Sequence, residues 1–225
     1  MSFTPLPKIF TDFCSKLDFP SSQIMEFGCG DGRFHDVLSD LGVPCWGLDR
    51  VSPEFGTVAH VVGEAACPPV VPASLDLLVV PNLLRHMVPA LSDFSFLGRW
   101  LDLLKPEGAL FIFEDEPGST SAGEANYRDL QVFLARLLPE SRGHLIPLEE
   151  FRAQSSSFQG KAFWEFGLVR NGQTIASEPV LEMLGPDLEA DGDPGSLARS
   201  IARDGLDPGH FWWARATTAK EGAAS

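Results

Sequence analysis

The most constraining feature of this chain is a run of three alternating glycines at residues 26–32 (EFGCGDG). A short apolar segment, residues 23–27, leads into the run and has the composition of a buried parallel strand. Glycine can turn sharply, and it lets bare backbone approach a ligand closely. The run therefore predicts a tight turn after a first strand, with its backbone facing a binding site.

The residues that follow predict a strand–turn–helix–strand unit. Apolar residues in segment 34–41 recur at the spacing of one helix face, and Gly42 follows where a helix C-cap belongs. A second strand, residues 44–48, ends directly on Asp49. An acid at the end of the second strand is the arrangement that holds the ribose hydroxyls of an adenosine-type cofactor.

The glycine spacing narrows the kind of cofactor. A dinucleotide fingerprint reads G-x-G-x-x-G around a pyrophosphate, whereas the spacing here is G-x-G-x-G. Glu26 precedes the turn and Asp31 lies inside it. Two carboxylates at this position would repel a pyrophosphate, but they suit a cationic ligand with an amino acid end.

On these residues the sequence resembles the class I S-adenosylmethionine-dependent methyltransferases, whose first motif is E/D-x-G-x-G-x-G. The resemblance continues in order through residue 115, about half of the chain. It implies an α/β fold: a doubly wound, mostly parallel seven-stranded sheet with helices on both faces and an antiparallel C-terminal hairpin. It also implies S-adenosyl-L-methionine as cofactor and S-adenosyl-L-homocysteine as product.

The resemblance assigns cofactor contacts to the segments that follow the first four strands. The expected cofactor residues are Glu26, Gly28, Cys29, Gly30, Gly32, Asp49, Arg50, Glu64, Ala65, Pro81 and Asn82. Glu64 is expected near the adenine amino group, although a solvated loop carboxylate would have the same sequence context.

Further elements follow from local patterns. Residues 6–17 carry apolar side chains at helical spacing and predict a packing or lid helix. In the first half we expect strands at 59–62, 74–80 and 109–113 and a helix capped by Ser92 through residue 104. The resemblance implies a turn at 105–108, before the fifth strand. In the second half we expect a helix at 127–138, strands at 163–169 and 173–176 around Asn171-Gly172, a helix at 193–205 and a last strand at 210–215.

The second half thus offers three strand candidates for the two places of the hairpin, so one candidate is an embellishment or a substrate cover. No linker or repeat argues for a second domain. We expect a single domain over residues 1–216, with 1–20 as the N-terminal helix segment and 116–205 as an elaboration on the substrate side. Residues 217–225 are expected to form a frayed tail.

Two groups are candidates for acid–base chemistry. The sulfonium methyl is already electrophilic, so a base is needed only when the acceptor arrives protonated. His86 follows the fourth strand, and a histidine can take up a proton near neutrality. Glu114, with Asp115, is the alternative base or a cation-binding pair. His86 could equally cap a helix or stack on the cofactor, and the two acids could be solvated surface groups.

Composition restricts the acceptor. Thirty-one acidic residues against seventeen basic ones give a net charge of −14, with no basic cluster. Nucleic-acid binding depends on neutralising phosphates, so the charge argues against a nucleic-acid substrate. It permits a small molecule, a cationic substrate or a protein partner with a basic patch. We expect no membrane partner and a cytoplasmic location.

The cysteines and histidines give no sign of a disulfide framework or a metal site. The four cysteines lack paired spacing, so we expect reduced, buried thiols. The histidines lack the spacing of metal ligands, so we expect no structural metal.

The sequence therefore predicts methyl transfer to the oxygen or nitrogen of a small molecule. Two alternatives stay open. One is a methyltransferase-like protein without catalysis that binds a cofactor or partner, because fold alone does not establish activity. The other is a nicotinamide-dependent oxidoreductase, which the glycine spacing disfavours.

Overall fold

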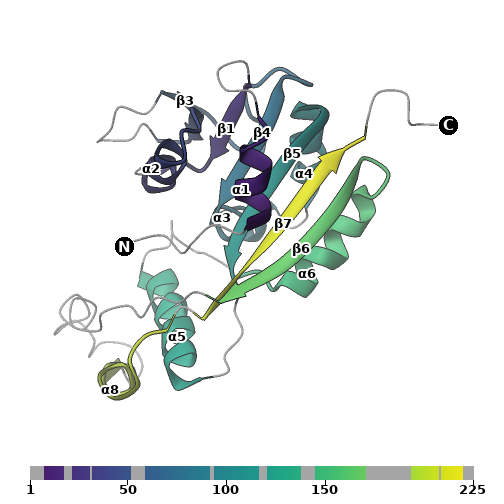
Figure 1. Cartoon of the computed structure of the whole chain (residues 1–225). Helices are drawn as coiled ribbons and strands as arrows, with labels where there is room; N and C mark the ends of the chain where they lie inside the picture. The colour runs from purple at the N-terminus through teal and green to yellow at the C-terminus, as the bar shows by residue number, and fades with distance from the viewer. Residues whose placement is uncertain are drawn as a thin grey trace.

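Seven strands form one sheet in the order β3-β2-β1-β4-β5-β7-β6 (Figure 1). The computed structural model describes residues 8–17, 22–30, 32–51, 59–91, 94–116, 121–137, 145–170, 194–207 and 209–219. The strands are β1 (Ile24–Phe27), β2 (Trp46–Asp49), β3 (His60–Val62), β4 (Leu75–Pro81), β5 (Leu104–Asp115), β6 (Ala162–Arg170) and β7 (His210–Thr218). The first five pair in parallel, and β7 runs antiparallel between β5 and β6.

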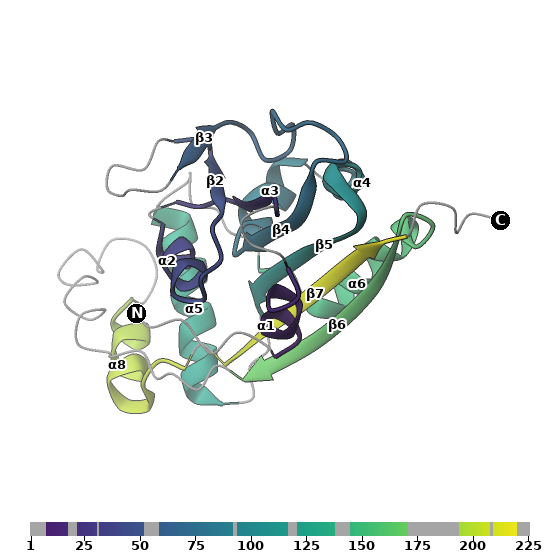
Figure 2. The same ribbon diagram turned by 45° about the horizontal axis from the view of Figure 1, so that its top comes forward.

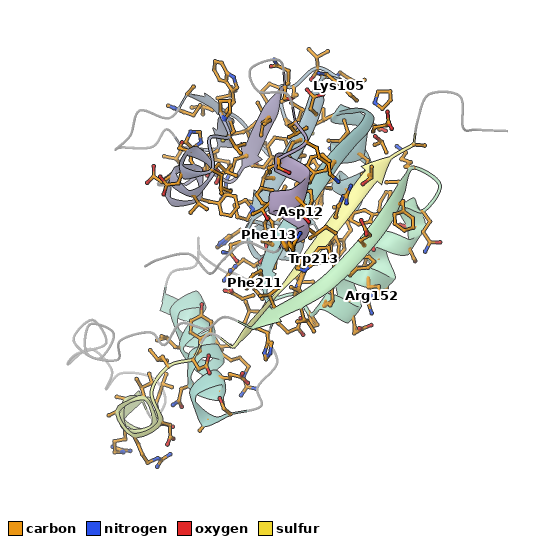
Figure 3. The ribbon with its side chains drawn as sticks, viewed as in Figure 1. Asp12, Lys105, Phe113, Arg152, Phe211 and Trp213 are labelled. Atoms are coloured by element: carbon orange, nitrogen blue, oxygen red, sulfur yellow. The ribbon has the colours of Figure 1, made fainter. Side chains whose placement is uncertain are left out.

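One face of the sheet is covered by α1 (Lys8–Cys14) and α2 (Arg33–Asp40). Phe10 of α1 is fully buried, and its ring lies 5.0 Å from that of Phe111 and 5.4 Å from that of Phe113. Phe211 and Trp213 of β7 extend this apolar layer beside Phe113 (Figure 3). The sequence predicted that the N-terminal helix packs against the core or forms a lid. The described residues of α1 pack against the core.

The opposite face is covered by α3 (Leu84–Leu91), α4 (Phe96–Leu103) and α6 (Leu148–Ser155), with a short 3-10 turn at Ser156–Phe158. Figure 1 shows α1 in front of the sheet and α4 and α6 behind it. Trp100 of α4 is fully buried and donates its indole N–H to the Ala65 carbonyl at 2.7 Å. This bond ties the loop after β3 to the second apolar layer.

Two helices lie side by side at one end of the sheet, α5 (Ala122–Leu137) and α8 (Pro194–Asp204), as both views show (Figures 1 and 2). The Asn126 amide donates to the Gly205 carbonyl at 3.0 Å, and the Asp207 N–H donates to the Gly123 carbonyl at 3.1 Å. Among the described residues, no helix has the length and apolar character needed to span a bilayer.

The predicted fold class is confirmed, since a mostly parallel sheet carries an antiparallel C-terminal pair and has helices on both faces. Residues 162–170 and 210–218 fill the two hairpin places. The third candidate, 173–176, and its Asn171-Gly172 turn lie outside the described residues, as does Ser92.

Two boundaries differ from the sequence prediction. The expected turn at 105–108 is a bulge within β5, because Leu75 pairs with Leu104 and Leu77 pairs with Ala109. The last strand continues to Thr218, three residues past its expected end at residue 215. The physical reason is pairing on both sides: Ala216 and Thr217 bond across to β5 and to β6, and Ala216 is fully buried.

Candidate functional site

The glycine turn is fixed against the second strand by its backbone. The N–H groups of Gly28 and Cys29 both donate to the Leu48 carbonyl, at 2.7 and 3.3 Å. Gly28 and Gly30 have φ angles of 74° and 48°, which favour glycine over other residues. The turn therefore presents backbone rather than side chains to the space beyond the end of β1.

Asp49 connects this turn to the next two loops. Its Oδ2 accepts the Gly30 N–H at 2.9 Å, and its Oδ1 accepts the Val51 N–H at 3.2 Å. Its carbonyl accepts the Gly63 N–H at 2.8 Å, which fixes the start of the loop after β3. The carboxylate is thus held by two backbone donors and retains lone pairs for further donors, because an ionised carboxylate offers about four acceptor positions.

A cavity of about 440 Å³ opens at these strand ends. It is lined by Gly28, Gly30, Leu48, Asp49, Arg50, Gly63, Glu64, Ala65, Ala66, Pro81, Asn82, Leu83, His86 and Met87. A Cβ atom added to Gly30 would enter this space, since its nearest neighbour is the Gly28 carbonyl oxygen at 3.9 Å. The chain thus leaves room beside the Asp49 carboxylate for a ligand that approaches the bare backbone.

The cavity brings together eight of the eleven residues expected at the cofactor, together with His86. Three of the expected residues do not line it. Gly32 is buried and its carbonyl accepts the Asp36 N–H in the first turn of α2. Cys29 is 4% exposed, and burial raises the pKa of its thiol to about 11, with the nearby Glu26 and Asp49 carboxylates adding to the rise.

Glu26 is the third residue that lies away from the cavity. Its side chain is 1% exposed, and its Oε2 lies 3.7 Å from the Nδ1 atom of His35 on α2. The motif acid therefore points between the sheet and α2. Asp31, which was expected inside the turn, lies outside the described residues.

The loop between β4 and α3 is anchored by Arg85, a residue that the sequence analysis did not single out. Its guanidinium donates to the side chain of Asn82 and, at 2.8 Å, to that of Asp115. Asn82 itself has a φ of 52° and donates its N–H to the Phe113 carbonyl at 2.7 Å. Arg85 is only 9% exposed and so needs such partners. The local sequence signal was an arginine between an apolar run and His86.

Glu114 serves the same loop rather than the cavity. Its carboxylate is 1% exposed, accepts the Leu84 N–H at the start of α3 at 2.6 Å, and lies 3.4 Å from the Nε atom of Arg85. Burial raises its pKa to about 7, although Arg85 opposes the rise. Glu114 thus contacts the N-terminus of α3 and does not line the cavity, and its expected role as a base stays a prediction.

His86 lies on α3 at the cavity wall, and its backbone N–H donates to the Leu83 carbonyl at 2.9 Å. Desolvation lowers the pKa of its imidazole below the ordinary value of 6.5, and the Arg85 and Arg50 guanidinium groups lower it further. The neutral imidazole is the form that accepts a proton, and this environment favours that form.

The remaining candidates fall in the core or on the surface. The aromatic rings of Phe10 and Trp212 are fully buried, so they are core residues. All four cysteines are free, and Cys14, Cys29 and Cys45 are buried as expected. Cys67 differs, because it is exposed and contacts Arg99.

No protein-family model and no curated protein matches this sequence. Solved structures do match. A putative methyltransferase of Bacillus halodurans has a TM-score of 0.60 at 12% identity, covering 94% of our chain and 98% of its own. The fold is that of the class I methyltransferases.

Two further structures agree with this methyltransferase fold. An S-adenosylmethionine-dependent methyltransferase of Methanosarcina mazei has a TM-score of 0.61 at 14% identity, covering 96% of our chain and 99% of its own. Phosphoethanolamine N-methyltransferase 2 of Haemonchus contortus has a TM-score of 0.56 at 16% identity over 95% of our chain. Our chain spans 52% of that nematode protein, whose structure contains phosphomonomethylethanolamine and S-adenosylhomocysteine.

Proposed function

We propose that this protein transfers a methyl group from S-adenosylmethionine to the oxygen or nitrogen of a small molecule. The observation that carries the proposal is the Asp49 carboxylate beside the bare backbone of Gly28 and Gly30, at one wall of a 440 Å³ cavity. The methyltransferase fold of the solved structures supports it.

In this proposal each wall of the cavity holds one part of the cofactor. Asp49 would accept hydrogen bonds from the ribose hydroxyls, and Gly28 and Gly30 would pack against the methionine and ribose portion. Glu64 and Ala65 lie at the adenine end. Pro81 and Asn82 form the wall where the cofactor meets the acceptor, and Arg50 lies at the mouth beyond Asp49.

The cofactor supplies an electrophilic methyl group on sulfur, so the chain must mainly align the acceptor and exclude water. His86 is the candidate base for an acceptor that loses a proton. Arg85, Glu114 and Asp115 hold the start of α3 and thereby orient His86 relative to the cavity.

The small-molecule acceptor is supported by charge. A net charge of −14 disfavours phosphate backbones and is compatible with a cationic or neutral acceptor. The structure of the Haemonchus contortus N-methyltransferase contains phosphomonomethylethanolamine, a small amine that also carries a phosphate group. We also propose a cytoplasmic location, because free thiols persist in reducing compartments and all four cysteines are free.

Two measurements test the proposal against its alternatives. Calorimetry of the full chain with S-adenosylhomocysteine and with NADH separates a methyltransferase from an oxidoreductase, and we expect binding of the former alone. Transfer of labelled methyl from S-adenosylmethionine to a panel of small amines, alcohols and phenols then separates an enzyme from a cofactor-binding protein without catalysis. Binding of NADH with no binding of S-adenosylhomocysteine would refute the proposal.

A further inference from the structure

Three side chains with metal-binding atoms converge behind the glycine turn. They are Glu26 in β1, His35 in the first turn of α2 and Cys45, which immediately precedes β2. The Sγ atom of Cys45 lies 3.0 Å from Nδ1 of His35, and the same nitrogen lies 3.7 Å from Oε2 of Glu26. One oxygen, one nitrogen and one sulfur thus lie within 4.8 Å of one another.

The cluster is withdrawn from solvent. Glu26 is 1% exposed, Cys45 is 8% exposed, and the His35 side chain retains 12%. A carboxylate in such surroundings is costly unless a cation or hydrogen-bond donors compensate it. A cation held by these three atoms would compensate that cost.

A single ring nitrogen faces both other ligand atoms. In a neutral imidazole Nδ1 carries either a hydrogen or a lone pair, so it serves one neighbour as donor or as acceptor. It cannot at once donate to the carboxylate and accept from the thiol. A cation between the three atoms would bind the lone pair of each.

We propose that Glu26, His35 and Cys45 form a binding site for one divalent transition-metal ion of the zinc type. Cysteine sulfur, histidine nitrogen and carboxylate oxygen are the ligands that zinc takes in proteins. Ligands about 2.0–2.3 Å from a tetrahedral ion lie about 3.3–3.7 Å apart. The Sγ–Nδ1 separation of 3.0 Å is below that range and the Nδ1–Oε2 separation of 3.7 Å is at its upper limit, so the side chains would have to rotate to hold the ion.

Charge balance supports a divalent ion. Ion binding would release the thiol proton of Cys45 to solvent. The resulting thiolate and the Glu26 carboxylate carry two negative charges and a neutral histidine adds none, so the complex with a doubly charged cation is neutral. Three protein ligands leave a fourth position for water. This assignment replaces the expectation of no metal, which rested on the spacing of the histidines along the sequence.

The ion would connect the three elements that carry the glycine turn. Glu26 pairs with Gly47 of β2, and His35 follows the turn on α2. None of the three ligands lines the 440 Å³ cavity, so the ion has a structural role and the proposal does not depend on the reaction. Binding should stabilise the folded chain in proportion to ion concentration.

The test uses the full chain, freed of metal by a chelator and titrated with Zn²⁺ alone. We expect one Zn²⁺ per chain by calorimetry and a rise in the unfolding temperature. We expect Co²⁺ to give the absorption of a tetrahedral ion with a thiolate-to-metal charge-transfer band. The Cys45→Ser variant should lose the charge-transfer band and bind Zn²⁺ at least about 100-fold more weakly. Cys67→Ser is the matched control, because Cys67 is exposed and outside the cluster.

A second variant distinguishes the loss of a metal ligand from the loss of the folded state. His35→Ala keeps good helix propensity in α2, so it should fold without metal and also lose Zn²⁺ binding. Absence of stoichiometric Zn²⁺ binding would overturn the proposal. So would binding that survives in both Cys45→Ser and His35→Ala, or binding that Cys67→Ser abolishes equally.

Discussion

The backbone N–H of Gly30 donates a hydrogen bond to the Asp49 carboxylate across 2.9 Å. The bond joins the turn after β1 to the end of β2, although the two residues are 19 positions apart. It fixes the carboxylate at the cavity wall before any ligand arrives. Preorganisation of this kind reduces the ordering cost of binding.

The first prediction concerns Asp49. Asp49→Ala should weaken binding of S-adenosylhomocysteine by at least tenfold, because a hydrogen bond to a charged group contributes about 1.5–3 kcal/mol. Calorimetry measures the affinity, and circular dichroism verifies the fold. Asp102→Ala is the control, since Asp102 forms an exposed ion pair with Lys161 and does not line the cavity. Equal affinity in the folded Asp49→Ala variant would refute the assignment.

The second prediction uses two glycines with similar backbone strain. Gly30 and Gly42 have φ angles of 48° and 72°, so alanine should destabilise each by about 1–2 kcal/mol. The methyl group of alanine at position 30 would enter the cavity. At position 42 it would have no atom within 4 Å, and Gly42 does not line the cavity. Gly30→Ala should therefore lose cofactor affinity and Gly42→Ala should keep it. Urea unfolding and calorimetry measure the two effects, and equal affinities would place the ligand elsewhere.

The third prediction concerns His86 as the base. His86→Ala should lower the methyl-transfer rate by about 10²–10⁴-fold while leaving cofactor affinity nearly unchanged. The lowered pKa keeps the imidazole neutral to more acidic pH, so the wild-type rate should fall only below pH 6.5. That acidic limb should disappear in the variant.

His60→Ala is the control for this experiment, because His60 lies on β3 and does not line the cavity. A His86→Ala variant that loses cofactor affinity but keeps its pH profile would make His86 a cofactor-side residue.

The fourth prediction concerns the pH dependence of stability at Glu114. Its folded pKa of about 7 is above the ordinary value of 4.5, so the folded state binds the proton more tightly. Its contribution to stability is full below pH 4.5 and is lost as the pH rises through 7. Glu114→Gln removes this loss, so its stability relative to wild type should improve between pH 4.5 and 7. Urea unfolding at several pH values measures the difference, and a constant difference would contradict the raised pKa.

Local sequence was sufficient for the unit that carries the candidate site. The apolar run before Gly28, the helical spacing up to Gly42 and the strand that ends on Asp49 each depend on neighbours within a few residues. Periodicity and turn chemistry act at that range. In the structure, the first and last residues of β1, α2 and β2 each lie within two positions of the predicted ones.

The surroundings of Glu114 depend on contacts that local patterns do not encode. Its partners, Leu84 and Arg85, lie about 30 positions earlier in the sequence. A carboxylate at a strand end has the same local context whether it faces a cavity or caps a buried helix. Packing of α3 across the end of β5 decides between the two.

The sequence by itself determined the first strand, the glycine turn, the helix after it and the second strand with its terminal acid, because these features follow from local periodicity and backbone freedom. Only the tertiary structure decided which side chains meet. Glu26, His35 and Cys45 are nine and ten positions apart, without the spacing of a metal motif. They converge because parallel pairing sets β1 beside β2 while α2 packs across both, and pairing between distant strands is fixed by the burial of whole faces.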